Sequence, residues 1–324
     1  MDTLQLTARD GAAIWLYRWL PSESFNGVVL ISHGLSEHGT RYQRLAESLC
    51  LAGYAVYAHD HRGHGAHAER VGWFAEEGGW DKVVTDLRQV ERHIALLHPG
   101  APLILFGHSM GSFIARAYLM LTGGVGLSAM VLSATGYRQG AMARVLRGVA
   151  KICSKVSGPR RQNRFLARLI FGGFNLTFWP RRTVADWLSR DQLEVDRYLA
   201  DPLCAFVPTP ALWIDLFGGV IALEHAEKHA RNLPGACPVL LLAGSRDPVS
   251  LGMFGLKQLA RRYRKAGFDA IEIKVYPGGR HEMHNEINRE QVVADLVCWL
   301  DDNAATSSSS IPTSERNSRE NTSF

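Results

Sequence analysis

The stretch that decides the fold is Leu103-Ile104-Leu105-Phe106-Gly107-His108-Ser109-Met110-Gly111. An apolar run of strand length leads into a serine flanked by glycines, and Phe113–Leu121 then opens a helix. A serine in such a G-x-S-x-G turn is predicted to lie on a tight bend, where the small neighbours relieve crowding. The free N–H groups at the start of the helix favour negative charge beside it. The pentapeptide alone could surround a buried structural serine, but its strand–turn–helix context favours Ser109 as a nucleophile.

A serine hydroxyl needs a base to remove its proton, and the base needs an acid to orient it. Asp247 lies in the turn Gly244–Pro248, directly after the apolar run Val239–Ala243, and His281 lies just after the run Ile271–Tyr276. Both positions follow predicted parallel strands, at the carboxyl ends where open α/β sheets place their sites. Two alternatives stay open at this point. Asp247 could be a turn or helix-capping aspartate, and His284, one helical turn further on, is the rival base.

Short apolar runs alternate with segments of helical periodicity over most of the chain. Runs of this kind are typical of strands buried on both faces of a parallel sheet. The sequence therefore predicts an α/β fold, a mostly parallel sheet with helices on both faces, and Ala13–Trp19 indicates an antiparallel strand at one edge. The expected parallel strands are Val28–Ser32, Ala55–Ala58, Leu103–Phe106, Met130–Ser133, Val239–Ala243 and Ile271–Tyr276.

The alternation of strands and helices is interrupted in the middle of the chain. From about Gly136 to Phe217 the sequence is helical and rich in aromatic residues, without a convincing strand. We therefore expect a helical insertion at 136–217 between two parts of one core, 1–135 and 218–300. From Asp301 onward the chain lacks apolar residues that could pack, so the tail 301–324 is expected to be disordered.

The composition is that of an ordinary globular protein, with 46% hydrophobic and 21% charged residues, which excludes collagen-like, coiled-coil and wholly disordered chains. The net charge of +5 is too small to indicate a nucleic-acid partner. The five cysteines form no CxxC pair, which is typical of free thiols in a reducing compartment. The N-terminus shows no signal-peptide pattern, and the longest apolar runs are of strand length. These observations predict a cytoplasmic protein.

A group of histidines raises the question of a zinc site, because HxHxxH patterns bind zinc in some hydrolases. The group consists of His59, His61, His64 and His67. A metallo-β-lactamase site has Asp directly before the third histidine, where this chain has Gly63. We interpret the segment as a glycine-rich loop at a strand end and expect neither a metal nor an organic cofactor. Glu37, His38 and Arg62, in nearby loops, are interpreted as groups that make local hydrogen bonds.

Five motifs, in order along the chain, resemble one branch of the α/β-hydrolases. They are His33-Gly34-Leu35-Ser36-Glu37-His38-Gly39 with Arg41-Tyr42, Asp60-His61-Arg62-Gly63-His64-Gly65, Gly107–Gly111, Gly244–Pro248 and His281–Glu286. The resemblance extends from about Val28 to Leu300. It is to the branch of monoacylglycerol lipases and lysophospholipases, which is also described as serine aminopeptidase-type hydrolases. The α/β-hydrolase fold is therefore expected.

The resemblance also implies roles for individual residues. Ser109 corresponds to the nucleophile, Asp247 to the acid and His281 to the base. The backbone N–H groups of Leu35 and Met110 correspond to the oxyanion hole. The insertion corresponds to the family's cap over the acyl pocket, which is its most variable part.

The resemblance implies a serine ester hydrolase that cleaves acyl esters, with monoacylglycerols or lysophospholipids as the expected substrates. A general carboxylesterase for short acyl chains and a non-catalytic binding protein of the same fold stay open as alternatives. No acidic residue occurs from Arg92 to Ala185, and the insertion contains many basic ones. This pattern fits either a cap that makes weak contact with a membrane surface or an ordinary cap whose charges face solvent.

Overall fold

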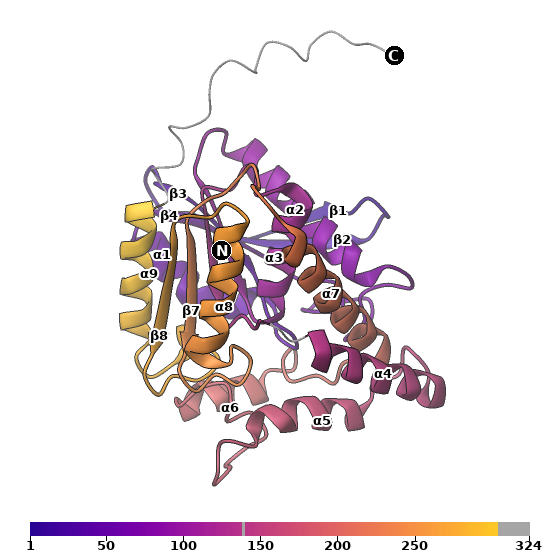
Figure 1. Cartoon of the computed structure of the whole chain (residues 1–324). Helices are drawn as coiled ribbons and strands as arrows, with labels where there is room; N and C mark the ends of the chain where they lie inside the picture. The colour runs from indigo at the N-terminus through magenta and orange to yellow at the C-terminus, as the bar shows by residue number, and fades with distance from the viewer. Residues whose placement is uncertain (138–139, 304–324) are drawn as a thin grey trace, which may run out of the picture.

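The computed structural model of the chain describes residues 1–137 and 140–303 (Figure 1). At its centre is an eight-stranded sheet with the strand order β1-β2-β4-β3-β5-β6-β7-β8. The strands are β1 (Asp2–Thr7), β2 (Ala13–Trp19), β3 (Gly27–Ser32), β4 (Tyr54–His59), β5 (Leu103–His108), β6 (Ala129–Ser133), β7 (Val239–Gly244) and β8 (Ile271–Tyr276). β1 and β2 pair antiparallel, as do β2 and β4, and all the other pairs are parallel. The predicted parallel sheet with an antiparallel edge is therefore confirmed.

The antiparallel edge includes a strand that the sequence did not predict. Residues of β1 are exposed or half-buried, so the strand lacks the continuous apolar run that marks the central strands. It is held instead by its register with β2, in which Asp2 lies opposite Arg18. The two side chains also form an ion pair at 2.8 Å.

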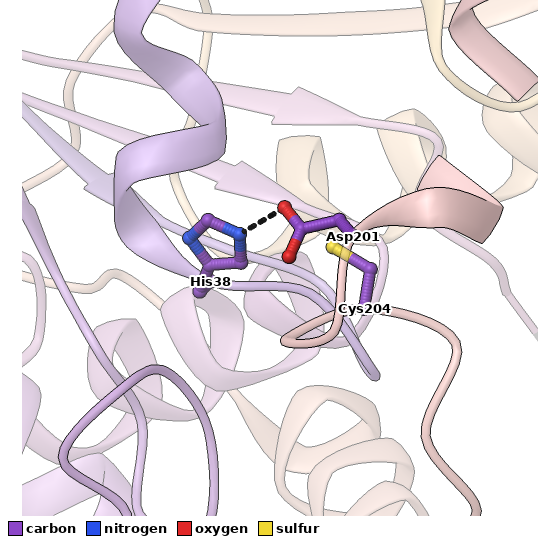
Figure 2. Close-up of side chains that lie close together, drawn as sticks. All are labelled: His38, Asp201 and Cys204. Atoms are coloured by element: carbon purple, nitrogen blue, oxygen red, sulfur yellow. Dashed lines mark hydrogen bonds and ion pairs between the residues drawn. The ribbon is translucent and has the colours of Figure 1, made fainter. Parts of the chain in front are cut away.

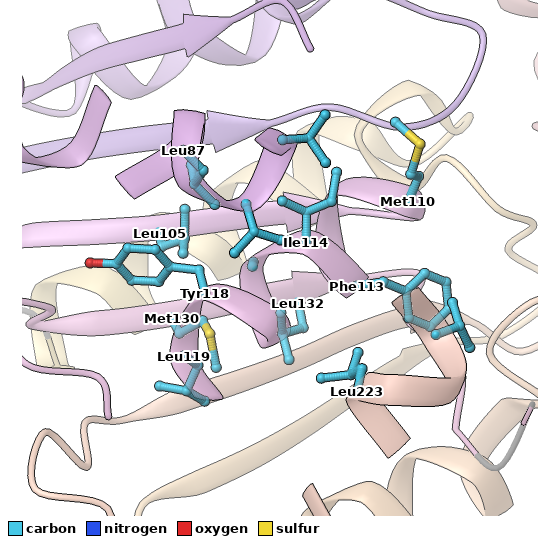
Figure 3. Packing of buried hydrophobic residues seen from close by; sticks show 14 of the residues in the cluster. Leu87, Leu105, Met110, Phe113, Ile114, Tyr118, Leu119, Met130, Leu132 and Leu223 are labelled. Atoms are coloured by element: carbon cyan, nitrogen blue, oxygen red, sulfur yellow. The ribbon is translucent and has the colours of Figure 1, made fainter. Parts of the chain in front are cut away.

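Helices cover both faces of the sheet, because consecutive residues of the buried central strands point to opposite sides. The helices are α1 (Gln43–Leu51), α2 (Gly79–Leu97), α3 (Met110–Thr122), α4 (Gly140–Ser157), α5 (Arg164–Asn175), α6 (Gln192–Ala200), α7 (Pro210–His229), α8 (Gly252–Lys265) and α9 (Arg289–Asn303), with short 3-10 turns at Gly39–Tyr42 and Met283–Asn285. On one face Leu30 and Leu105 pack in a core with α2, α3 and α8. Figure 3 shows Ile114 of α3 within this layer. On the other face Ile31 and Phe106 pack with α1 and α9.

Helices α4, α5 and α6 lie together at one end of the molecule, between β6 and β7 in the sequence (Figure 1). α4 packs along α7, and α7 also packs against α2 and α3 of the core. The boundary expected at residue 217 therefore lies inside one continuous helix. A buried ion pair at 2.8 Å between Arg116 of α3 and Glu227 of α7 fixes the far end of that helix to the core.

The last helix, α9, extends to Asn303, so the prediction that a disordered tail begins at residue 301 is wrong for its first three residues. Tyr54 donates a hydrogen bond to Asp301 at 2.7 Å, and the Asn303 side chain donates to the carbonyl of Trp299 at 2.9 Å. The rest of the expected tail lies outside the described residues. None of the helices in 1–137 and 140–303 has the length and apolar character needed to cross a membrane.

Candidate active site

Ser109 lies on the sharp turn between β5 and α3. Its φ of +51° is in the left-handed region, which residues other than glycine rarely adopt. The turn is tightly packed, since a Cβ at Gly107 would lie 2.7 Å from the carbonyl oxygen of Gly111. A Cβ at Gly111 would in turn overlap the carbonyl of Ser32. The N–H of Ser109 donates to the carbonyl of Ser133 at 3.0 Å, so β6 also holds the strained turn in place.

Asp247 and His281 form a buried hydrogen bond. Nδ1 of His281 lies 2.7 Å from Oδ1 of Asp247, and both side chains are almost completely buried. The carboxylate also accepts from the backbone N–H groups of Val249 at 3.0 Å and Ser250 at 3.3 Å, so the turn after β7 fixes its orientation. A hydrogen bond from Nδ1–H to the carboxylate leaves Nε2 as the basic nitrogen. The structure thus brings together the two residues predicted as acid and base.

The ring of His281 lies near those of Trp187 and His108, with centroid distances of 4.7 and 4.9 Å. His108 directly precedes Ser109, so His281 and Ser109 lie at the same end of the sheet. The backbone N–H of His281 also donates to the carbonyl of Trp187 at 3.3 Å. The sequence placed Trp187 among the aromatic residues of the insertion that could line an apolar tunnel above Ser109, but it did not predict the contact with His281. Its only sequence signal is its aromatic type, because the contact joins two segments that are far apart in the chain.

His284, the rival base, has a different environment. Its ring stacks on Tyr42 with a centroid distance of 4.8 Å, and neither ring nitrogen has a hydrogen-bond partner among the described residues. Burial, together with the neighbouring His108, lowers the pKa of His284 to about 3. A histidine with such low basicity and without an orienting acid is a poor proton acceptor. The geometry therefore favours His281.

The loop after β3 passes directly beside Ser109. A Cβ at Gly34 would lie 2.6 Å from Oε1 of Glu37 and 3.3 Å from the Cβ of Ser109, so the absence of a side chain lets this loop pass close to the serine turn. Leu35 is the next residue of this loop. Met110 is the first residue of α3, and an N–H at that position has no partner within its own helix. The backbones of both residues predicted for the oxyanion hole thus lie next to the serine turn.

Comparison with known proteins places this arrangement in a family. The family model that matches, over residues 23–288, is that of the serine aminopeptidase, S33. The chain belongs to this family. The monoacylglycerol lipase of Mycolicibacterium smegmatis is 31% identical to it over 284 residues, which cover 87% of this chain and 90% of that protein. The monoglyceride lipase of Homo sapiens is 30% identical, and the match covers 96% of this chain and 94% of that protein.

Solved structures of this fold resemble the chain over nearly its whole length. A carboxyl esterase from Bacillus coagulans in complex with glycerol has a TM-score of 0.84 at 26% identity, covering 94% of this chain and 98% of that one. A soluble variant of the monoglyceride lipase from Saccharomyces cerevisiae has a TM-score of 0.69 at 20% identity, covering 93% and 95%. The predicted α/β-hydrolase fold is thereby confirmed.

Within this family member, Glu37 connects the loop beside Ser109 to the loop of His281. Its carboxylate accepts from the N–H of Gly34 at 2.5 Å and from Arg41 at 2.9 Å. Arg41 also donates two hydrogen bonds, of 2.6 and 2.7 Å, to Glu282, the residue after His281. The sequence predicted local hydrogen bonds for Glu37, which the contact with Gly34 confirms. It did not indicate the link to Glu282, because that link joins two distant loops.

A mostly apolar cavity of about 520 Å³ lies between α5 and the segments 181–187 and 205–207. Trp187 and Phe171 are among the residues that line it. Trp187 also contacts the ring of His281, so this residue belongs both to the wall of the cavity and to the surroundings of the candidate base.

The four histidines considered as zinc ligands lie in β4 and the loop after it. His59, His61 and His64 are buried, and burial lowers the pKa of each, to about 4 for His59 and His64. His67 stacks on Trp15 with a centroid distance of 3.7 Å. Among the residues that the structure describes, one group of three possible metal ligands converges, and none of these histidines belongs to it. Neighbouring rings of this group contact one another, with His59 and His61 centroids 4.6 Å apart, but their ring nitrogens do not converge as one set of metal ligands among the described residues.

Proposed function

We propose that the protein is a carboxylic ester hydrolase in which Ser109 is the nucleophile, His281 the general base and Asp247 the orienting acid. The observation that supports this most strongly is the buried 2.7 Å contact between Asp247 and His281. It lies at the end of the sheet where the strained turn exposes Ser109, which is partly accessible. Acyl transfer requires a hydroxyl nucleophile, a base that removes its proton and an acid that orients the base.

In the proposed mechanism, Nε2 of His281 takes the proton of Ser109 as its Oγ attacks the ester carbonyl carbon. The N–H groups of Leu35 and Met110 stabilise the oxyanion that forms, and Asp247 stays ionised and stabilises the imidazolium. His281 then gives the proton to the departing alcohol, which leaves an acyl-enzyme. Water, activated by the same histidine, releases the acid. No step needs a metal or an organic cofactor.

Monoacylglycerols or lysophospholipids are the substrate class that we propose. The Mycolicibacterium smegmatis and human relatives are named monoacylglycerol lipase and monoglyceride lipase. The apolar cavity of about 520 Å³ beside Trp187 suits a fatty acyl chain, because its walls would remove chain methylenes from water.

A general carboxylesterase for short acyl chains is the second candidate. It is favoured by the similarity to the Bacillus coagulans structure, which is described as a carboxyl esterase and has a TM-score of 0.84. A non-catalytic binding protein of the same fold is the third, although binding alone gives no reason for a buried acid–base pair.

A covalent probe and a substrate panel separate these candidates. We expect a fluorophosphonate to label the protein once, at Ser109, and Ser109→Ala to abolish labelling and lower turnover by several orders of magnitude. The panel compares p-nitrophenyl esters of increasing acyl length with monoacylglycerols and lysophosphatidylcholine. Rates that rise with acyl length support the lipid substrates, and a strict preference for acetate esters supports the carboxylesterase. Absence of both labelling and turnover would leave only the binding protein.

We also infer a weak contact with anionic lipid surfaces through α4 and α5. Apolar side chains on these helices are exposed, with relative exposures of 83% for Val156, 64% for Ile152 and 62% for Phe165. Lys151 and Lys155 are exposed beside them on α4. Basic groups attract anionic head groups while apolar side chains enter the interface. We propose no nucleic-acid partner, and the cytoplasmic location stays a prediction.

A further inference from the structure

Three different metal-ligand groups lie close together outside the proposed catalytic residues (Figure 2). Nε2 of His38 is 2.9 Å from Oδ2 of Asp201. Three possible ligand atoms, one each from His38, Asp201 and Cys204, lie within 4.8 Å of one another. His38 belongs to the loop after β3, and the other two residues follow α6. We propose that His38, Asp201 and Cys204 form a binding site for a divalent transition metal of the zinc type.

The donor set fits such an ion, and its atoms, which lie within 4.8 Å of one another, need small shifts to reach the spacing of a tetrahedral site. Zn²⁺ binds imidazole nitrogen, carboxylate oxygen and thiolate sulfur, and in a tetrahedral site these atoms lie about 3.4–3.6 Å apart. The pair His38–Asp201, at 2.9 Å, therefore has to open by about 0.5 Å. The Asp201 side chain is 31% exposed, against 8% for that of His38, so the ion and a water as fourth ligand can enter beside the carboxylate.

The surroundings also suit a bound cation. Oγ1 of Thr40 lies 2.7 Å from Nδ1 of His38, and when Nδ1–H donates to this hydroxyl, Nε2 presents its lone pair to the metal. Burial raises the pKa of the Cys204 thiol, while the charge of Arg41 acts in the opposite direction. Metal binding therefore has to release the thiol proton to solvent. The thiolate and the carboxylate then balance the two charges of the ion, and Arg41 is already paired with two carboxylates.

The cluster joins the loop beside Ser109 to the wall of the apolar cavity. The N–H of Ala205 donates to the carbonyl of Ser36, and the Ser36 hydroxyl donates to the carbonyl of Phe206, both at 3.0 Å. Phe206 lines the cavity, so a metal at the cluster adds strong bonds across an existing contact between two segments. The unfolded chain has no preformed site, so the ion would bind preferentially to the folded chain. Bound metal should therefore raise the melting temperature. The inference does not depend on ester hydrolysis.

The experiment uses the full chain with Ser109→Ala, so that binding is measured without turnover. A second substitution, His229→Ala, removes the exposed pair His225–His229 on α7, whose ring centroids are 4.4 Å apart and which could bind metal at the surface. Co²⁺ and Zn²⁺ are the probes. We expect one equivalent of Co²⁺ to bind with a thiolate-to-cobalt charge-transfer band, Zn²⁺ to displace it, and Zn²⁺ to raise the melting temperature.

Variants of the cluster decide the outcome. Cys204→Ser should abolish the charge-transfer band, and Cys204→Ser and Asp201→Asn should each weaken binding at least tenfold. Cys237→Ser is the matched control, because its thiol is equally buried but lies outside the cluster, and it should change nothing. If Cys204→Ser does not fold, Asp201→Asn gives the answer, since Asp201 is partly exposed. Lack of the band in the parent chain, or unchanged binding in the cluster variants, overturns the proposal. Neither result affects fluorophosphonate labelling of the chain with Ser109 intact, so the two proposals fail separately.

Discussion

The hydrogen bond between His281 and Asp247 distinguishes His281 from the nearby His284. Under the proposed mechanism, His281→Ala should lower kcat about as much as Ser109→Ala, because members of one catalytic unit act non-additively. The kcat of His284→Ala should stay within about tenfold of the wild-type value, since the ring of His284 has no orienting acid. Steady-state kinetics on a soluble ester, with folding checked by circular dichroism, measure both effects. An inactive His284→Ala beside an active His281→Ala would show that the base was assigned one turn too early.

Arg41 is largely buried, with 11% of its side chain exposed, and its loss should lower the stability of the fold. It pairs with both Glu37 and Glu282, which are buried as well. Burial raises the pKa of the Glu282 carboxyl, but the charge and hydrogen bonds of Arg41 outweigh this and hold that pKa well below its usual range. Arg41→Ala leaves two buried carboxylates without this partner, and we expect the free energy of unfolding to fall by about 3–5 kcal/mol.

Urea unfolding at neutral pH measures this loss. Arg197→Ala is the control, because it removes an ion pair with Glu194 from an arginine whose side chain is 68% exposed. Glu194 keeps its ion pair with Arg44 at 2.7 Å, and a pair with an exposed arginine contributes at most about 1 kcal/mol, so this variant should remain close to the wild type. Equal losses in the two variants would mean that the buried network adds nothing beyond a surface pair.

Helix α5 offers two adjacent positions that separate the cavity from the outer surface of the helix. A Cβ at Gly172 or Gly173 would meet no atom within 4 Å, so the helix accepts a side chain at both. Gly172 lines the cavity of about 520 Å³, whereas Gly173 is exposed. Gly172→Leu should therefore shift the preferred esters toward shorter acyl chains, and Gly173→Leu should not.

The specificity constant kcat/KM for p-nitrophenyl esters of increasing length measures this shift. In the wild type it should rise with each methylene until the cavity is filled, at about 0.8 kcal/mol or fourfold per methylene. The rise should stop at a shorter chain in Gly172→Leu. If both variants keep the wild-type profile, the acyl chain binds elsewhere.

The elements that could be predicted from the sequence are those with a local signal. The turn Gly107–Gly111 and the continuous apolar run of β7 depend only on their own residues. β1 gave no such signal, because its side chains alternate between exposed and half-buried and its position depends on pairing with β2. The boundary at residue 217 fell inside α7 because one face of this helix, including Leu216 and Val220, is buried on both sides of that point.

The same distinction holds for the candidate site. Asp247 and His281 could be proposed as acid and base because each directly follows a strand. The carboxyl ends of parallel strands lie at one edge of the sheet. The contact of Trp187 with His281 could not be predicted, because it depends on how the segment between α5 and α6 folds over that edge. Glu282 also required the structure, because its partner Arg41 lies in another loop.

At the scale of the whole molecule, the folded chain buries several histidines in their neutral form. They are His33, His59, His61, His64, His108 and His284, and for each of them burial is the main cause of a lowered pKa. In the unfolded chain a histidine has a pKa near 6.5. Between pH 6.5 and about 4 the unfolded chain therefore binds protons that the folded chain does not. The free energy of unfolding should be highest above pH 6.5 and fall toward pH 4, by up to about 1.4 kcal/mol per pH unit and histidine.

Urea unfolding across this pH range measures the slope. His59→Met should make it shallower by about one proton, because it removes a titrating ring whose nitrogens have no hydrogen-bond partner among the described residues. A free energy of unfolding that is constant from pH 7 to 4 would contradict the neutral burial of these residues.

The charge distribution of the molecule allows lipid contact and ester hydrolysis to be tested separately. No acidic residue occurs from Arg92 to Ala185, a stretch that includes the partly apolar, basic helices α4 and α5. If these helices contact anionic lipid, hydrolysis of a lipid in anionic vesicles should fall as salt rises, since the screening length shortens from about 10 Å at 0.1 M to 3 Å at 1 M. Hydrolysis of a soluble neutral ester should not change, because the Asp247–His281 pair is buried.

Two matched double variants assign the effect to this surface. Lys151→Gln with Lys155→Gln, on α4, should slow hydrolysis in anionic vesicles and leave the soluble ester unaffected. Arg264→Gln with Lys265→Gln removes the same charge from the exposed end of α8 and should affect neither substrate. Equal salt dependence on both substrates, or equal effects of the two double variants, would exclude a lipid contact through α4. Both results would leave the chemistry proposed for Ser109 intact, because screening acts at the interface and not at the buried pair.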